Sequence, residues 1–182
     1  NGFKDSNIKV ARDGVDLDEF NIQITKEDAR KILFEKIHHE SFGRKKIAVY
    51  IGSLYPWKGY NIFSETIFLK TIRDLVAENV NYLICIFGGT DMTIKELQEE
   101  LNNNLHKHPS LIPMLSLGGR APHQIIPVIL KAADCAILTG NELDIISAKY
   151  TSPLKMFEYM ASGCPIVAQD LPSFREVLNE TN

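Results

Sequence analysis

The chain has 182 residues, a length typical of one domain. Hydrophobic residues make up 45% and charged residues 24%, with a mean hydropathy of -0.09, which suits a globular domain and excludes a disordered chain. The net charge of -3 gives no broad basic field, so we expect no nucleic-acid partner. No apolar run approaches the ~20 residues that a membrane helix needs.

The chain has three cysteines, Cys85, Cys135 and Cys164, which lie far apart and form no CxxC motif. This spacing excludes a disulfide framework or a zinc knuckle and favours a reducing, cytoplasmic location. The first residues, 1–5, show neither a basic region nor an apolar region of a signal peptide, and we expect the chain to be an internal piece of a longer protein.

From residue 46 onward, short β-branched runs alternate with stretches of helical periodicity. The runs are almost continuously apolar, as strands are when helices cover both faces of a sheet. Five strand-then-helix units predict a parallel, doubly wound α/β sheet. The predicted strands are residues 46–52, 82–87, 112–117, 135–139 and 165–169. The predicted helices are residues 58–78, 93–106, 123–133, 153–162 and 174–178.

The first 45 residues have a different pattern. Residues 8–11 predict a short strand, and residues 25–40 predict a helix that Thr25 caps, with Asp28 three residues further on. We therefore divide the chain into an entry strand and helix, residues 1–45, and an α/β domain, residues 46–182.

Ligands of parallel α/β sheets bind outside the carboxyl ends of the strands. In this chain those ends are marked by Gly52, by glycine pairs at 88–89 and 118–119, and by a loop over residues 140–151. A single glycine is most simply a turn residue, but it also lets the backbone approach a ligand. Glycines at several neighbouring strand ends predict a cleft at this edge.

The helix that follows the fourth predicted strand begins with favourable residues for a helix start. Ser152 is a good N-cap, and Pro153 suits the first helical position. Leu154, Phe157 and Ala161 are predicted to form the buried face of this helix.

The start of this helix also predicts an anion site. The amides of Leu154 and Lys155 have no partner within the helix, and the helix dipole favours a phosphate there. Lys155 would add a positive charge, and Glu158 would project one turn further on. The alternative is a capped amphipathic helix with a surface pair between Lys155 and Glu158.

Two further cations follow predicted strands. Lys58 lies next to Gly59 after the first strand, and Arg120 follows the third. Each is, taken alone, most simply a solvated surface residue. Together with Lys155 they would suit a diphosphate in one cleft.

Other motifs are weak or missing. The DxD pattern at residues 16–18 follows a turn rather than a core strand, and the five histidines show no ligand spacing, so we predict no metal site. The chain has no GxGxxG, GxxxxGK[ST] or GxSxG motif, which disfavours a dehydrogenase, a P-loop enzyme and an α/β hydrolase.

In their order and spacing, these segments resemble the C-terminal, nucleotide-sugar-binding domain of the retaining GT-B glycosyltransferases known as glycosyl transferases group 1 (GT4). The most specific match is residues 152–168, which resemble the family's SPLKxFEYMAxGxPIVA signature. The others are residues 10–20 with NGVDxxxF, 52–59 with GRLxxxKG, 83–89 with LxIxGxG, and 117–134 with a GxV…AD pattern.

The resemblance implies a Rossmann-like fold and roles for individual residues. Lys58 would bind the donor diphosphate, the amides of Leu154 and Lys155 would hold the same phosphates, and Glu158 would accept hydrogen bonds from the ribose. The backbone around residues 119–120 would contact the base. Lys58 and Glu158 are the implied catalytic residues. The implied donor site comprises Ser53, Lys58, Gly119, Arg120, Ser152, Leu154, Lys155 and Glu158.

The resemblance also implies what this chain would bind. Its substrate would be a nucleotide sugar, with no cofactor and no metal, and its setting polysaccharide or cell-envelope synthesis in the cytoplasm. A sugar, lipid or protein acceptor would be held by an N-terminal half that these residues lack, with peripheral membrane association of the full-length enzyme. The isolated chain would bind the donor without transferring sugar.

Two positions depart from the family pattern. Tyr150 stands where the family often has a glutamate, and Ser53 stands where it has an arginine. Lys155 would substitute for that arginine at the phosphates. The alternatives are a GT-B sugar-nucleotide epimerase and a non-catalytic nucleotide-binding module.

Overall fold

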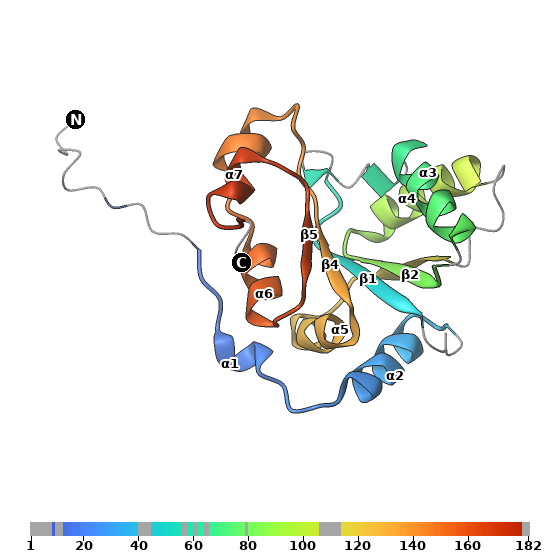
Figure 1. Ribbon diagram of the computed structural model, residues 1–182, viewed down its shortest axis with the longest axis horizontal. Helices are drawn as coiled ribbons and strands as arrows, with labels where there is room; N and C mark the ends of the chain where they lie inside the picture. The colour runs from blue at the N-terminus through green and yellow to red at the C-terminus, as the bar shows by residue number, and fades with distance from the viewer. Residues whose placement is uncertain are drawn as a thin grey trace.

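The computed structural model describes residues 9, 13–39, 45–55, 58–59, 62–63, 66–78, 80–105 and 114–179 (Figure 1). Its strands are β1 (Lys46–Ile51), β2 (Tyr82–Phe87), β3 (Leu115–Gly119), β4 (Cys135–Leu138) and β5 (Ile166–Ala168). Its α-helices are α1 (Leu17–Phe20), α2 (Lys26–Lys36), α3 (Thr66–Ala77), α4 (Asp91–Leu105), α5 (Ile126–Ala132), α6 (Leu154–Ala161) and α7 (Pro172–Arg175). A 3₁₀ turn, η5 (His123–Ile125), and a π-helical turn, η6 (Ile146–Tyr150), complete the elements.

The five strands form one parallel sheet in the order β3-β2-β1-β4-β5. Strand β1 is central: Val49 pairs with Cys85 of β2 on one side and with Ala136 of β4 on the other. The chain runs outward from β1 to β3 and then returns to β4 on the other side. This confirms the Rossmann-like, doubly wound fold and places its switch point between β1 and β4.

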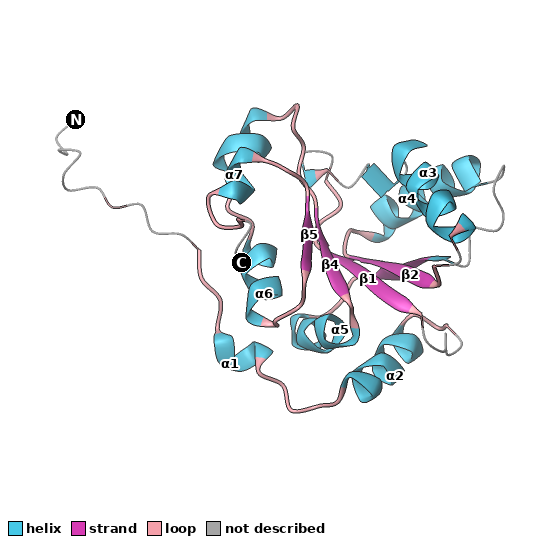
Figure 2. Ribbon diagram, viewed as in Figure 1, coloured by secondary structure: helices cyan, strands magenta, loops and turns pink. Residues whose placement is uncertain are grey.

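Helices cover both faces of the sheet (Figure 2). On one face α2, α5, α6 and α7 pack around a core that includes Leu33, Ile129 and Tyr159. On the other face α3 and α4 contribute Ile72 and Leu97 to a second core. Strands buried between two such layers have apolar side chains on both faces, which explains why their sequences do not alternate.

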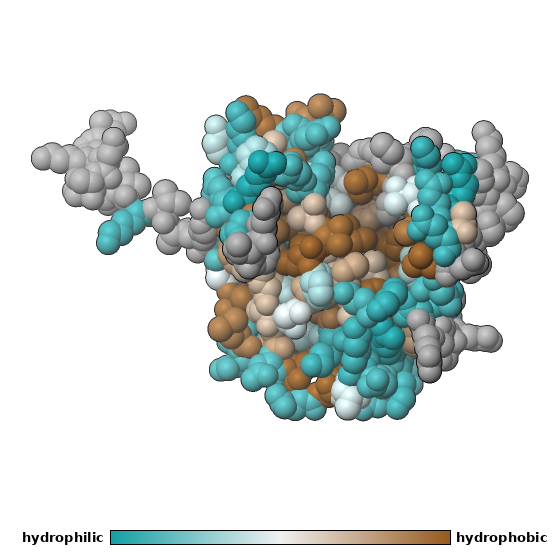
Figure 3. Space-filling model, in the orientation of Figure 1, coloured by the Kyte–Doolittle hydropathy of each residue, from teal (hydrophilic) through white to brown (hydrophobic). Residues whose placement is uncertain are grey.

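On the face of the molecule drawn in Figure 3, hydrophilic residues cover α2. Apolar residues reach the surface near the centre of this face. Val167 of β5, the edge strand of the sheet, is exposed. Among the described residues, no helix is both long and apolar enough to cross a membrane.

Several predicted boundaries need correction. Helix α3 begins at Thr66, not at residue 58, and β3 begins at Leu115, whereas residues 112–113 of the predicted strand lie outside the described residues. The predicted strand at 8–11 also lies outside them, apart from Lys9. Helix α2 confirms the Thr25 cap, whose hydroxyl accepts a hydrogen bond from the Asp28 amide at 3.1 Å.

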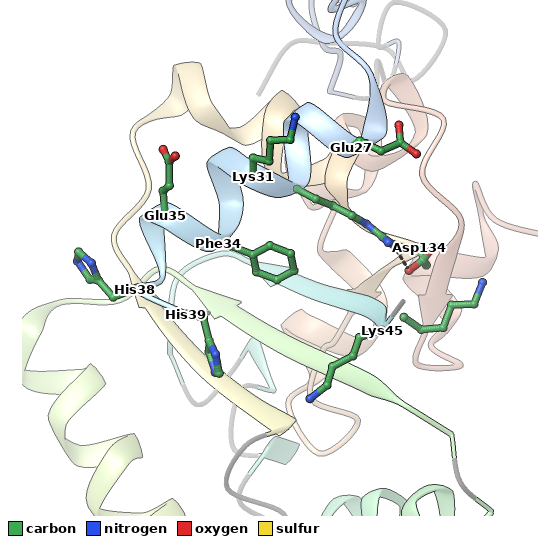
Figure 4. Close-up of a pocket in the computed structure, with 10 residues that line it drawn as sticks. Glu27, Lys31, Phe34, Glu35, His38, His39, Lys45 and Asp134 are labelled. Atoms are coloured by element: carbon green, nitrogen blue, oxygen red, sulfur yellow. Dashed lines mark hydrogen bonds and ion pairs between the residues drawn. The ribbon is translucent and has the colours of Figure 1, made fainter. Parts of the chain in front are cut away.

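The amino end of the sheet is held by Asp134 (Figure 4). Its carboxylate accepts hydrogen bonds from Arg30 Nη2 at 2.7 Å, from Lys26 Nζ at 2.8 Å and from the amide of Ile47 at 2.7 Å. These bonds tie α2 to the first residues of β1 and β4. A cavity of about 810 Å³ lies beside them, with Phe34 reaching into it from α2.

Candidate functional site

The carboxyl end of the sheet carries two adjoining cavities, which confirms the expected cleft. One, of about 390 Å³, lies between the ends of β1 and β4 and the start of α6. The other, of about 360 Å³, lies over the ends of β2 and β3. Both are lined by Ile51, Gly52, Ser53 and Ile126, so they form one groove along this edge.

Lys155 is the most unusual side chain in this groove. Its Nζ is fully buried and has no hydrogen-bond partner among the described residues. It lies 4.4 Å from the centroid of the Tyr50 ring, whose hydroxyl donates to the carbonyl of Ser53 at 3.0 Å. Burial, and then the nearby charge of Lys58, lowers the pKa of Lys155 to about 7. The groove therefore contains a buried amine for which the described residues provide no hydrogen-bond acceptor.

Ser152 lies beside this lysine, but it is not the N-cap that its sequence predicts. Helix α6 starts one residue later than expected, and its N-cap is Pro153. Proline has no side-chain acceptor, so no side chain caps this helix. The Ser152 hydroxyl lines the same cavity, and its oxygen is buried without a partner in the described part of the chain. The first amides of α6, those of Leu154 and Lys155, have no partner within the helix either.

Lys58 lines the groove, but it does not begin the helix that the sequence predicts from residue 58. It lies in a turn that precedes α3, and its carbonyl accepts a hydrogen bond from the Thr139 hydroxyl at 2.8 Å. Next to it, Gly59 has a φ of +72°, and a Cβ there would lie 2.0 Å from the Gly140 oxygen. Only glycine allows residue 59 to pack so closely on Gly140. This packing places Lys58 at the end of β4, in the same cavity lining as Lys155.

Glu158 also lines the cavity between β1, β4 and α6. Its side chain is 16% exposed, and Oε1 lies 3.4 Å from Nε2 of His123. It does not pair with Lys155, so the alternative of a surface pair between these two residues is wrong. The predicted convergence of lysines and a carboxylate at the start of α6 is present in the structure.

Arg120 and Gly119 lie at the other end of the groove. Gly119 has a φ of +65°, and its carbonyl accepts a hydrogen bond from the Gly88 amide at 2.9 Å. Arg120 is exposed and lines the cavity over β2 and β3. Because Ser53 lines both cavities, it lies between Arg120 and the lysines.

Tyr159 is a positioning residue that the sequence reasoning missed. Its buried hydroxyl donates to the carbonyl of Ile51 at 3.1 Å and accepts from the Ile51 amide at 3.0 Å. Burial raises the pKa of Tyr159 well above its usual value, so the hydroxyl remains neutral. These two bonds hold α6 against the last residue of β1 and thereby fix the start of α6 next to the groove. A tyrosine within an apolar helical face was the available signal.

The buried face of α6 differs from the predicted one. Met156 and Tyr159 are fully buried, whereas Leu154 is exposed and Phe157 and Ala161 are only partly buried. The buried face of α6 is therefore carried by Met156 and Tyr159 rather than by the predicted residues. Lys155, on the same helix, lines the groove.

Two further positions that the sequence singled out are Tyr150, where the family often has a glutamate, and Asp16, the first residue of the DxD pattern. Tyr150 ends the π-helical turn η6, and its side chain is exposed. Asp16 is the N-cap of α1, where its carboxylate accepts a hydrogen bond from the Asp18 amide at 2.9 Å. The DxD pattern is accounted for by this helix start.

The comparisons with known proteins agree with this geometry. Residues 45–182 match the model of the family described as glycosyl transferases group 1. No curated protein sequence matches the chain.

Several solved structures share the fold at low sequence identity. The chain superposes on Anabaena Alr3699/HepE, solved in complex with UDP and glucose, with a TM-score of 0.67 and 17% identity, over 98% of this chain and 42% of that one. It also superposes on the C-terminal domain of a glycosyl transferase group 1 family protein, LpcC, from Francisella tularensis, with a TM-score of 0.64 and 20% identity, over 92% of this chain and 76% of that one. The chain thus spans less than half the length of the Anabaena protein.

Proposed function

The chain belongs to the glycosyl transferases group 1 family, and on this premise we propose that it binds the nucleotide-sugar donor of a retaining glycosyl transfer. One observation carries the proposal: at the start of α6, Lys155 Nζ and Ser152 Oγ are buried and have no hydrogen-bond partner among the residues that the structure describes. Buried polar groups are normally paired, so an unpaired set at the mouth of a cavity indicates a ligand.

A diphosphate is the ligand that best completes this set. It supplies negative charge and acceptor oxygens for Lys155, Ser152 and the two free amides of α6, and it lies where the helix dipole is positive. Lys58 contributes a second positive charge, since its proximity already lowers the pKa of Lys155. The arginine that the family has at Ser53 is replaced in this role by Lys155.

The adjoining cavity over β2 and β3 would receive the nucleoside. The backbone at Gly119 and Arg120 would contact the base, and Glu158 would accept hydrogen bonds from the ribose hydroxyls. The Anabaena protein that shares this fold was solved with UDP and glucose, and with UDP-glucose, which supports a sugar nucleotide as the ligand class.

In the reaction, the same residues would stabilise the departing diphosphate. Negative charge grows on it as the glycosidic bond breaks, and Lys58, Lys155 and the α6 amides are arranged to offset that charge. We assign only this donor side to the chain. The acceptor would bind in a second domain. We therefore expect that these residues alone bind the donor without transferring sugar. Donor binding should not require a metal ion.

The first test is a search for the ligand. A thermal-shift screen of UDP-, GDP- and ADP-sugars should identify one nucleotide that stabilises the chain, and EDTA should not change the shift. Since we propose that these residues supply the donor side alone, we expect an affinity of about 1 µM to 1 mM. A chain that none of these compounds stabilises would contradict the proposal.

The second test separates phosphate from nucleoside contacts. Lys155→Met should weaken binding of the selected nucleoside diphosphate by about 2–3 kcal/mol, the scale of a hydrogen bond between charged groups, and Lys58→Ala should act in the same direction. Neither change should affect binding of the free nucleoside. Lys131→Met is the matched control, because Lys131 is exposed on α5, away from the groove. Calorimetry measures all of these affinities, and equal losses for both ligands would show that the lysines do not contact phosphate.

Two other functions make different predictions for an enzyme that holds both the donor and the acceptor. An epimerase would convert the donor into its isomer without an acceptor. A binding module would hold the donor without turnover. Acceptor-dependent release of the nucleoside diphosphate, with the sugar recovered on the acceptor, identifies the transferase.

A further inference from the structure

His123 lies between two carboxylates from different parts of the chain. Its Nε2 is 3.4 Å from Oε1 of Glu158 on α6, and its Nδ1 is 3.6 Å from Oε2 of Glu19 on α1. The ring also packs edge-on against Phe20, with 6.5 Å between the ring centroids. The histidine thus connects α1, the 3₁₀ turn η5 and α6 beside the groove.

The two carboxylates have different surroundings. Glu158 is 16% exposed and lines the cavity, whereas Glu19 is 53% exposed and lies on the outer side of the histidine. A carboxylate only accepts hydrogen bonds, so Nε2 must carry a proton to hold Glu158. A neutral ring that is protonated on Nε2 donates to Glu158, and an imidazolium is in addition close enough to Glu19 for an ion pair.

This arrangement leaves half of the Glu158 carboxylate for a ligand. His123 contacts Oε1, and the described residues provide no hydrogen bond to Oε2. A glutamate side chain has several rotamers, and its immobilisation on binding has a cost that a prior hydrogen bond reduces. His123 itself is 53% exposed, so its contribution to the core is small.

We propose that His123 is a positioning residue that orients Glu158 toward the ribose hydroxyls of the nucleotide. Its Nε2–H holds Oε1 of Glu158, and Glu19 keeps the imidazole ring turned toward α6. This inference rests on the proposed function, since it assigns a partner to the carboxylate that would bind the ribose. His123 does not contact the ligand in this arrangement and acts only through Glu158.

The test compares two ligands that differ only at the hydroxyls in question. UDP, GDP and ADP are titrated first, and the tightest is compared with its 2′,3′-dideoxy analogue by calorimetry. His123→Ala should weaken binding of the ribonucleotide roughly 3- to 10-fold and leave the dideoxy analogue unchanged. His123→Gln, whose amide can still donate to Glu158, should restore most of the loss. Glu19→Gln should have a smaller effect of the same selectivity.

A double-mutant cycle shows whether His123 acts through Glu158. Glu158→Gln should remove the preference for the ribonucleotide, and His123→Ala in that background should cause no further loss. Additive losses, or equal losses for both ligands, would overturn the proposal and leave His123 as a packing residue. If the unmodified chain binds none of the three nucleotides, the proposed function itself fails. If it binds one and His123→Ala changes nothing, only the role of His123 fails.

Discussion

Two charged side chains at opposite ends of the same sheet have opposite surroundings. At the amino end, the Asp134 carboxylate accepts hydrogen bonds from two cations and one amide. At the carboxyl end, Lys155 Nζ has no hydrogen-bond partner in the described part of the chain and faces an aromatic ring and a second lysine. Both ends also carry a cavity, and the one near Asp134 is the larger.

The difference shows why cavity size does not identify the functional site of this fold. A charge whose partners all come from the protein stabilises the structure and needs no ligand. A buried charge without partners costs stability, and such groups cluster at functional sites, where a ligand can supply the missing partner. This contrast supports our proposal of a donor site at the carboxyl end of the sheet, while the bonds of Asp134 hold α2 in place at the amino end.

The largest expected effect comes from removing the unpaired charge. Lys155→Met should abolish most of the affinity for the nucleoside diphosphate while raising the unfolding free energy at neutral pH, because it replaces a buried cation by an apolar side chain. Thermal unfolding and calorimetry on one preparation measure both quantities. Lower stability together with unchanged affinity would mean that Lys155 is a structural residue like Asp134.

The stabilisation by Lys155→Met should also depend on pH. The folded chain lowers the pKa of Lys155 from 10.5 to about 7, so between these values the unfolded state binds more protons and the stability of the unmodified chain rises with pH. Below pH 7 the cost of the buried charge is fully present. The difference in unfolding free energy between the variant and the unmodified chain should therefore be largest below pH 7 and shrink toward pH 10.5.

The second effect concerns the paired charge. Asp134→Ala should lower the unfolding free energy by about 2–3 kcal/mol, since it removes charged hydrogen bonds and leaves the Ile47 amide unpaired, and it should leave nucleotide affinity unchanged. Asp134→Asn keeps an acceptor for Ile47 and should lose less. Denaturant titration gives both values.

Acid should weaken this same anchor. Burial alone would raise the pKa of Asp134, but the hydrogen bonds from Lys26 and Ile47 and the charges of Lys26 and Arg30 outweigh it and lower the pKa below 3.8. The stabilisation is thus present above 3.8 and is lost as the pH falls through the lowered value. Asp134→Asn should lack this acid dependence.

The third effect concerns the link between core and site. Tyr159→Phe should lower the unfolding free energy by about 1–3 kcal/mol, because both polar groups of Ile51 lose their partner. Nucleotide affinity should fall as well, since the start of α6 is then less firmly placed. Tyr82→Phe is a control in the opposite core, where the Tyr82 hydroxyl donates to the carbonyl of Ile72. It should lower stability without lowering affinity.

The smallest effect is expected at the exposed end of the groove. Arg120 is exposed, so Arg120→Ala should weaken nucleotide binding by less than about 1 kcal/mol, and high salt should remove the difference. Binding isotherms at low and high ionic strength measure it. A loss as large as that of Lys155→Met would place the phosphates at Arg120 instead.

The fold was predictable because its signals are local. Continuous apolar runs and the glycines that follow them were sufficient to predict the parallel sheet and the edge that holds the groove. The start of α6 was predicted one residue too early, since Ser152 is a favourable N-cap in sequence but its hydroxyl is turned into the cavity.

Contacts between distant residues could not be predicted from this single sequence. The bonds from Tyr159 to Ile51 join residues 108 positions apart, and the pair of His123 and Glu158 spans 35 positions. The burial of Lys155 depends on the Tyr50 ring and on the position of Lys58, which the packing of Gly59 on Gly140 determines. Residue types predicted a phosphate site, but only the fold shows that Lys155 is buried without a hydrogen-bond partner in the described ranges.

The central claim is that a diphosphate is the missing partner of Lys155. Since the pKa of the free side chain is lowered to about 7, a bound diphosphate should raise it and the chain should take up a proton on binding. Calorimetry of the selected nucleotide at about pH 8, in buffers with different ionisation enthalpies, counts these protons. We predict uptake approaching one proton for the unmodified chain and none for Lys155→Met. Equal proton uptake in both proteins, with equal affinity, would contradict the account.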